Sequence, residues 1–278
     1  MGKSSKQRLR ARSVALARGL TGAIGVLSAV GGGLSHPGSL HAEPTTAPLG
    51  PEWERDCAGI DAGSLPQGAQ IVGLPGGGGP VLFICGVLTG AGVGSGGPDF
   101  QDMYLVNVVD PANFYIATAE ATGYEGFADF DTQVYVFRFS PNPAEAGIGL
   151  LGNEDFSAEI PQSAATSAAN DDTNAQLTEP GLYYIAVSGR GSSPRVTFAS
   201  RPVAIFDFRA DPTQRSGPDG PAGGFPIDAW SGDGAVGSYR LELNGVEFID
   251  TSRLAELAGV LPWRSVAGRS VPGTLEKN

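Results

Sequence analysis

Short hydrophobic runs, separated by turn residues, recur along this chain of 278 residues. The runs are rich in Val, Ile, Tyr and Phe, which favour strands, and Gly, Pro, Asn and Asp cluster between them, as they do at strand ends. We expect eight strands in one domain, at 69–74, 80–88, 102–109, 113–119, 132–139, 181–188, 201–208 and 238–249. Strands of this length and spacing predict an all-β, antiparallel β-sandwich.

The polarity within the runs predicts where the strands lie. Apolar and polar residues alternate over 239–244, which is typical of an outer strand with one buried and one solvated face. The apolar set is Tyr239, Leu241 and Leu243, and the polar set is Arg240, Glu242 and Asn244. Residues 134–137 and 182–187 are apolar on both faces, which favours central strands that are covered on both sides or flanked by packed loops.

Two long segments, 140–180 and 207–236, are predicted to be loops, because they are too long for hairpin turns. The chain has 42 Gly and 21 Pro and only 17% charged residues, which also favours a turn-rich β protein over a helical one. Residues 251–260 have the composition of a short helix, and no apolar run in the tail to Asn278 is long enough for an anchor.

The first 42 residues have the pattern of a signal peptide. Six basic residues precede the apolar run GLTGAIGVLSAVGGGL, and Ala42 occupies a small-residue cleavage position. We therefore expect export to the periplasm, the cell surface or the medium, with a flexible leader at 43–56 and no membrane span after cleavage. A basic tail or an uncleaved anchor is the alternative interpretation.

Cleavage after Ala42 would make the chain strongly acidic. It would remove six of the 18 basic residues and none of the 29 acidic ones, which leaves 12 basic against 29 acidic residues, a net charge of −17. Such a surface repels phosphate backbones and anionic headgroups, so we expect no nucleic-acid partner and no binding to the membrane surface. Cations are more compatible partners.

Nothing in the sequence completes a catalytic motif. His36 and His41 both lie in the segment expected to be cleaved, and Lys277 is the next-to-last residue, so Ser-His-Asp, Cys-His and Ser-Lys chemistry lack their bases. Ser188 and Ser231 lie beside glycines but outside a Gly-x-Ser-x-Gly frame, which indicates turn serines. We expect a protein that is not an enzyme.

One glycine motif resembles a dinucleotide fingerprint without its context. Gly92-x-Gly94-x-x-Gly97 follows a predicted strand, but Pro98 and another strand come next, where a nucleotide site requires a helix. The motif is interpreted as a flexible turn.

The two cysteines, Cys57 and Cys85, lie in the part of the chain expected to be exported. An even number of cysteines in that setting indicates a disulfide. The bond would contribute on the order of 3 kcal/mol by constraining the unfolded chain. The alternative of a reactive thiol lacks a nearby cation that would lower the pKa.

Acidic clusters follow several strands, at Asp99 and Asp102, Asp129 and Asp131, 153–155 and 170–172. Carboxylate and amide oxygens suit calcium, although 170–175 lacks the glycine and the final Glu of an EF-hand loop. From spacing alone, acidic residues that only solvate the loops are the favoured interpretation, and paired carboxylates could also serve glycoside hydrolysis.

Four motifs in a fixed order resemble the bacterial pre-peptidase C-terminal-like domain: DMYLVNVVDPANFYIATA, FDTQVYVF, GNED and PGLYYIAVSG. The later GPDGPAGGFPIDAWSGDGAVGSYRLELNGVEF is similar to the closing segment of a secreted, stand-alone subgroup of that family. The similarity covers about 57–250. It implies a jelly-roll-like sandwich that is exported and noncatalytic and that in some relatives binds calcium or extracellular polymers.

The resemblance also implies a possible calcium set. It would consist of Asp102, Asp131, Asn153 and Asp155, with Glu154 in place of the middle Asp of an Asn-Asp-Asp motif.

Together these patterns predict a secreted binding or scaffolding module whose partner is an unidentified extracellular polymer or envelope protein. A secreted glycoside hydrolase that uses two carboxylates is one alternative. A carbohydrate-binding module is the other, in which Tyr124, Tyr183 or Trp230 would stack on sugar rings. Each of these aromatic residues also fits ordinary packing.

Overall fold

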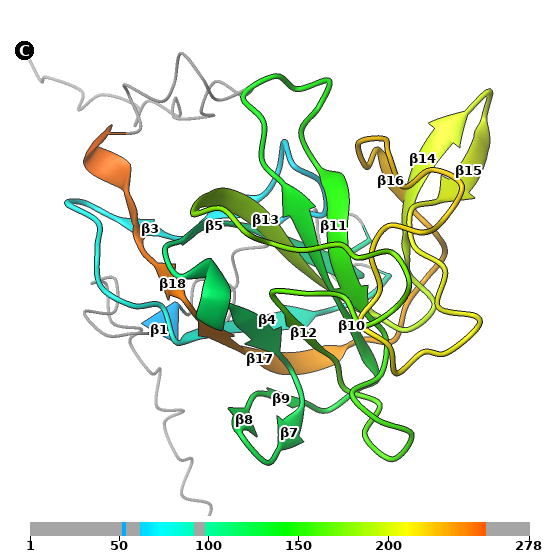
Figure 1. Cartoon of the computed structure of the whole chain (residues 1–278), viewed down its shortest axis with the longest axis horizontal. Helices are drawn as coiled ribbons and strands as arrows, with labels where there is room; N and C mark the ends of the chain where they lie inside the picture. Colours follow the sequence, from blue (N-terminus) through cyan, green and yellow to red (C-terminus); the bar gives the residue numbers. More distant parts are fainter. Residues whose placement is uncertain (1–51, 54–61, 92–97, 254–278) are drawn as a thin grey trace, which may run out of the picture. The chain divides into compact units, whose positions relative to one another are not determined.

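A computed structural model of the chain describes residues 52–53, 62–91 and 98–253 (Figure 1). All of them belong to one compact unit, Glu43–Asn278. In these residues the fold is built from strands, with two short 3-10 helices, η2 Pro111–Asn113 and η3 Thr251–Arg253. The all-β prediction is therefore confirmed. No helix in the described part of the chain is long and apolar enough to cross a membrane.

One sheet, the central sheet, has the strand order β11-β10-β13-β5-β18, and β2 pairs with β5. Its pairs are antiparallel except for β2 with β5. The strands are β2 Gln70–Ile71, β5 Gln101–Val108, β10 Thr132–Arg138, β11 Ile148–Asn153, β13 Gly181–Gly189 and β18 Val246–Glu247.

The second sheet, the outer sheet, has the order β1-β4-β17-β6-β12, and β9 pairs with β17. The pair β1 with β4 is parallel and the others are antiparallel. The strands are β1 Glu52–Trp53, β4 Phe83–Leu88, β6 Tyr115–Ala117, β9 Phe127–Ala128, β12 Ala164–Thr166 and β17 Gly237–Asn244.

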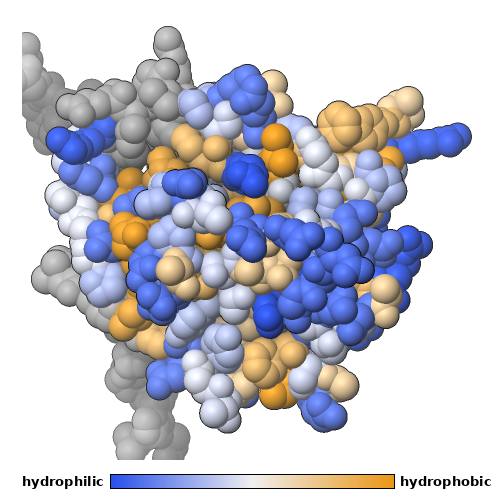
Figure 2. Space-filling model, viewed as in Figure 1, coloured by the Kyte–Doolittle hydropathy of each residue, from blue (hydrophilic) through white to orange (hydrophobic). Residues whose placement is uncertain are grey.

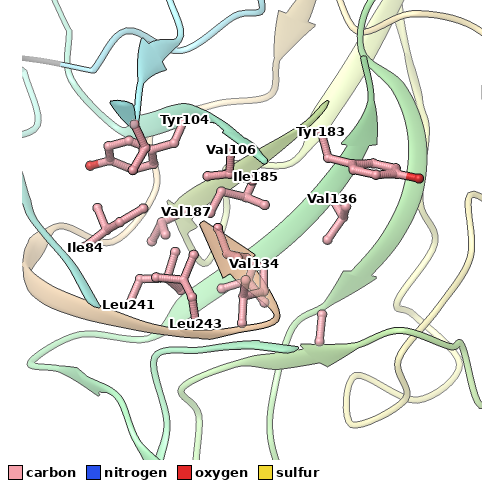
Figure 3. Packing of buried hydrophobic residues seen from close by; sticks show 14 of the residues in the cluster. Ile84, Tyr104, Val106, Val134, Val136, Tyr183, Ile185, Val187, Leu241 and Leu243 are labelled. Atoms are coloured by element: carbon pink, nitrogen blue, oxygen red, sulfur yellow. The ribbon is translucent and has the colours of Figure 1, made fainter. Parts of the chain in front are cut away.

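The main core fills the space between these two sheets. Figure 3 shows Val134, Ile185 and Val187 of the central sheet facing Leu241 and Leu243 of the outer sheet. All five side chains are almost completely buried. Burial of each such side chain contributes about 1.5–3 kcal/mol, so the apolar half of β17 holds the sandwich closed.

The central sheet is also covered on its other face. Tyr135 and Phe137 of β10 pack there against Phe206, and Tyr135 also contacts Phe208. Tyr184 of β13 belongs to the same cluster and contacts Phe139. This second core explains why 134–137 and 182–187 are apolar on both faces, and the prediction that they form central strands is confirmed.

Three small sheets complete the fold. One, with the order β15-β14-β16, consists of β14 Pro194–Phe198, β15 Arg201–Ala204 and β16 Ala229–Trp230. The β14–β15 hairpin is drawn in yellow in Figure 1. The other two pair β3 Gly73–Leu74 with β19 Ile249–Asp250, and β7 Glu120–Ala121 with β8 Tyr124–Glu125.

Each of the eight predicted runs contains a strand, but the last run is divided into β17, β18 and β19. Gly245 makes the break with a φ of +75°, and a Cβ there would lie 2.5 Å from the carbonyl oxygen of Asp110. Only glycine adopts this conformation without strain. The chain thus leaves the outer sheet after Asn244 and pairs with the central sheet at Val246.

The prediction that 140–180 is only a loop is wrong, because the segment contains β11 and β12. The sequence does not predict β11, because the strand contains glycines and glycine disfavours strands in general. Here they are required: a Cβ at Gly149 would lie 2.7 Å from Cγ2 of Ile205, and one at Gly152 would lie 3.0 Å from the ring of Tyr135. The second core packs directly on this backbone.

The other long segment, 207–236, has only β16 as regular structure, as the loop prediction requires. At the end of the domain, Thr251–Arg253 form one turn of 3-10 helix. The rest of the helix predicted at 251–260 lies outside the described residues, as do the predicted signal peptide and Cys57.

One polar position of β17 is not solvated. Glu242 is only 9% exposed, because the hydroxyl of Tyr115 donates to its Oε1 at 2.7 Å and the backbone N–H of Glu125 donates to its Oε2 at 2.5 Å. The prediction of a solvated face is therefore correct for Arg240 and Asn244 and wrong for Glu242.

Candidate functional site

Asp102, the first predicted calcium ligand, is buried in the main core and only 1% exposed. Its Oδ2 accepts a hydrogen bond of 2.5 Å from the hydroxyl of Tyr239, whose oxygen lies 2.7 Å from the hydroxyl of Tyr104. Because Asp102 and Tyr104 are two residues apart on β5, they face the same side of the sheet. The carboxylate therefore links the two sheets through tyrosine.

Asn153, another predicted ligand, is occupied by the chain itself. Its Nδ2 donates to the carbonyl oxygens of Asp155 and Gln214, and its Oδ1 accepts from the backbone N–H of Ala164. These bonds use both amide hydrogens and the amide oxygen. Asn153 positions the loop after β11.

The carboxyl groups of Asp131 and Asp155 do lie close together. Glu154 joins them, and all three surround the guanidinium of Arg190. Arg190 Nη1 lies 3.3 Å from Asp131 Oδ2, and its Nε lies 3.3 Å from Glu154 Oε1. Burial raises the pKa of all three carboxyl groups, and the charge of Arg190 partly offsets that rise. We call this group the Arg190 cluster.

The Arg190 cluster fits a metal ion only in part. Asp131 Oδ1 and Asp155 Oδ1 are buried and accept no hydrogen bond, which would suit a cation. However, Arg190 already supplies a positive charge there, and no group of three His, Cys, Asp or Glu residues in the described ranges has the arrangement of a metal site. The four predicted ligands are not brought together as one set.

Other acidic residues of the predicted clusters bind backbone N–H groups. Asp99 Oδ2 accepts from the N–H of Thr89, Asp129 Oδ1 from that of Ser238, and Asp171 Oδ2 from that of Gly217, at 2.8–2.9 Å. Such bonds satisfy loop donors that have no partner in a sheet. Much of the acidic character of these loops thus serves their backbone conformation.

The Arg190 cluster borders a pocket of about 790 Å³, which we call the arginine pocket. This volume is within the usual range for ligand sites. Its polar lining comes from Gln133, Glu154, Arg190, Ser193, Arg195, Asp207, Arg209 and Ser231. Figure 2 shows that hydrophilic residues gather over the loops that follow β15.

The three arginines of the pocket differ in their partners. Arg190 is paired with Asp131 and Glu154, and Arg209 is paired with Asp207 through its Nη2. Arg195 is half-buried and makes no hydrogen bond or ion pair with any described residue, and its Nε is buried without an acceptor. Arg195 is therefore the one arginine of this lining that makes no ion pair with a described residue, although Asp207 of the same lining is near enough to interact with it electrostatically.

Arg195 is held in place by its backbone. It belongs to β14, where it pairs with Ala204 of β15 on one side and with Ala229 of β16 on the other. Its carbonyl oxygen also accepts from the N–H of Asp228. The strand is therefore fixed on both edges, and only the side chain is unpartnered.

Hydrogen-bonding groups and apolar surface lie around this arginine. Gln133 is 2% exposed, and its Oε1 accepts no hydrogen bond. Ser231 Oγ accepts from the N–H of Ser193, which joins two walls of the pocket. Phe206 and Phe208 are stacked with centroids 6.0 Å apart and contribute apolar lining.

The two carboxylates that line the pocket have opposite pKa shifts. Burial is the main cause that raises the pKa of Glu154, whereas the hydrogen bond from Arg209 lowers that of Asp207 to about 2. Asp207 is thus ionised over the whole physiological range. Glu154 holds a proton more readily than an ordinary glutamate.

A second hollow of about 690 Å³ lies beside the β7–β8 hairpin. Glu120, Tyr124, Glu125, Phe127 and Arg240 are among its lining residues. Arg240 lies over the ring of Phe83, 4.6 Å from its centroid, and donates to the carbonyl oxygen of Glu125. The cation of this hollow therefore already has partners.

The aromatic residues predicted to stack on sugars are mostly structural. Trp230 packs on Tyr135 and donates from Nε1 to the carbonyl oxygen of Ser64. Tyr183 is 9% exposed and donates to the carbonyl oxygen of Glu179. Tyr124 contacts Tyr115 and Phe156 and lines the second hollow.

Ser188 is fully buried at the end of β13, and its hydroxyl donates to the carbonyl oxygen of Ser192. Ser188 is therefore a strand residue, paired with Gln133 on one side and Gln101 on the other, and only its hydroxyl stabilises the turn into β14. The Gly92–Gly97 motif lies outside the described residues.

Sequence reasoning missed Arg195 and the arginine pocket. Val196, which follows Arg195 in PRVTF, packs into the second core, and this alternation is a weak signal that Arg195 faces outward. Nothing near Arg195 in the sequence indicates that its charge is unpaired. That property depends on loops that are distant along the chain.

Comparison with protein-family models, curated proteins and solved structures finds no match to this chain.

Proposed function

We propose that this chain is an exported, noncatalytic β-sandwich module that binds its ligand in the arginine pocket. The observation that carries the proposal is Arg195, a half-buried guanidinium without a partner in the wall of an open pocket. A guanidinium in such a place lacks full hydration and a hydrogen-bonded counter-ion, so a ligand that supplies an acceptor gains a charge-assisted hydrogen bond. The signal-peptide pattern and the order of the family motifs support an extracellular or envelope role.

The proposal is tested by closing the pocket. Ala204 lies opposite Arg195 in the β14–β15 ladder, so the change Ala204→Trp would place a large ring beside the guanidinium. We expect the full-length wild-type chain to be retained on at least one immobilised extracellular glycan or matrix protein and Ala204→Trp to lose that retention while it keeps its melting temperature. Equal retention of the two proteins would refute the proposal.

A glycoside hydrolase is the second candidate, because Glu154 and Asp207 line one pocket and their pKa values are shifted in opposite directions. Environments that move two carboxyl pKa values apart are those that assign one group as acid and the other as base. A reducing-sugar assay on the polymers that the protein retains tests this alternative. Release of sugar by the wild type that is lost in Glu154→Gln would replace the binding module with an enzyme.

Calcium binding and membership of the pre-peptidase C-terminal-like family also remain proposals. The two buried carboxylate oxygens of Asp131 and Asp155 are what supports the calcium proposal. An ion bound only by the native state raises the melting temperature. Equal melting temperatures in millimolar calcium and in chelator would refute it.

A further inference from the structure

We infer that the ligand of the arginine pocket is an anionic saccharide, a sugar chain that carries carboxylate or sulfate groups. This inference rests on the binding function proposed above and names the chemistry of its ligand. The three arginines of the pocket differ in whether their charge is paired. Arg190 and Arg209 are paired with carboxylates of the chain, whereas the guanidinium of Arg195 has no ion pair among the described residues.

The pocket offers few positive charges to a ligand, because only Arg195 of the described lining arginines has no ion pair. Glu154 and Asp207 lie in the same lining as Arg195, and they repel a ligand with closely spaced phosphates. One isolated negative group can reach Arg195, whereas neighbouring parts of the ligand must be neutral. Hydroxyl groups meet that condition, because they donate hydrogen bonds to carboxylates and accept them from other donors.

The rest of the pocket lining is a mixture of neutral polar and apolar groups. Ser193 and Ser231 supply hydroxyls, and Gln133 supplies an amide. Phe206, Phe208, Pro202, Val203, Pro212 and Pro221 supply apolar surface. A pyranose ring matches this mixture, because it presents hydroxyls around its edge and C–H groups on its faces. A sugar acid adds the single anion that Arg195 lacks.

Three galactose oligomers of equal length test the inference, since they differ only at carbon six: the neutral oligomer, the galacturonate and the 6-sulfate. Titration calorimetry with the full-length chain should give affinities at least about ten-fold higher for one or both anionic oligomers than for the neutral one. Arg195→Gln should lose most of that difference and leave the neutral affinity nearly unchanged.

Arg201→Gln is the matched control, because Arg201 is an exposed arginine on β15 outside the pocket lining. It should bind as the wild type does, and all variants should keep the wild-type melting temperature. Whichever of the galacturonate and 6-sulfate oligomers binds more tightly identifies the anionic group that the pocket prefers. Arg195→Lys retains charge without the planar fork, so partial retention of affinity would indicate bidentate recognition, and full retention would indicate charge alone.

The failures of the two proposals differ. If the neutral oligomer binds as tightly as both anionic ones and Ala204→Trp abolishes all three, the ligand class is wrong and the pocket remains the binding site. If an anionic oligomer binds but Arg195→Gln does not weaken it, the inference is also wrong. If no oligomer binds and a protein ligand is retained in the pocket instead, a saccharide is excluded.

Discussion

Tyr239 of the outer sheet donates a hydrogen bond to Asp102 of the central sheet, with 2.5 Å between the phenolic oxygen and Oδ2. Both residues are 1% exposed. The bond crosses the main core, so a residue expected to hold calcium instead takes part in joining the two layers. A buried carboxylate requires such donors, because a charge without partners in the core is costly.

Replacing Tyr239 with Phe tests this link. The ring still fills its place, but Asp102 loses a donor, and we expect unfolding to become easier by about 1–3 kcal/mol. Chemical denaturation measures the change. Tyr183→Phe is the control, since the hydroxyl of Tyr183 donates to the backbone carbonyl oxygen of the exposed residue Glu179 and its loss should reduce stability less. Equal losses for the two variants would contradict a special role for the core bond.

Gly86 makes room for Tyr239. It lies opposite Tyr239 in the β4–β17 pair, and a Cβ there would lie 2.2 Å from the phenolic oxygen. Gly86→Ala must therefore displace a fully packed ring, and we expect a loss of about 2 kcal/mol or more. Gly224→Ala is a matched control, because no heavy atom lies within 4 Å of the added Cβ, and its melting temperature should change little.

The strands that the sequence predicts are those whose side chains carry the apolar pattern. Val134, Ile185 and Leu241 lie in the main core, and their period reflects burial on one or both faces of a sheet. β11 lacks the alternating pattern, because Leu150 and Leu151 both lie in the main core while the backbone at Gly149 and Gly152 packs against the second core. A strand face that packs without side chains gives no hydrophobic period to detect.

The candidate site was less predictable than the fold. Asp131 and Asp155 are adjacent in space, as the resemblance implies for members of one set, but no sequence pattern places Arg190 between them. Partners such as Tyr239 for Asp102 and Ser238 for Asp129 are more than a hundred residues away. The role of a carboxylate depends on such partners, which local spacing does not specify.

The disulfide is tested directly by counting thiols. Cys85 lies on β4, and Cys57 lies outside the described residues, so the pairing stays a prediction. The full-length chain, unfolded without reductant, should react with no thiol reagent, and reduction should release two thiols. We expect reduction to lower the unfolding free energy by on the order of 3 kcal/mol. Two reactive thiols before reduction would contradict the bond.

The stability of the protein should depend on pH through the carboxyl groups of the Arg190 cluster. The folded-state pKa of Asp131, Glu154 and Asp155 is raised, chiefly by burial. The folded protein therefore binds protons more tightly than the unfolded chain, and these groups reduce stability as pH rises above their ordinary pKa of about 4. Arg190 limits this loss of stability, because its positive charge lowers the pKa of all three carboxyl groups.

Arg190→Gln removes that compensation. We expect a lower melting temperature at about pH 7, equivalent to about 1 kcal/mol because solvent screens the half-exposed guanidinium, and a smaller difference near pH 4.5, where the carboxyls are partly protonated. Arg209→Gln is the control: its partner Asp207 has a pKa of about 2, so its small effect should not change between these pH values. A pH-independent loss in Arg190→Gln would show that the cluster is held by packing and not by charge.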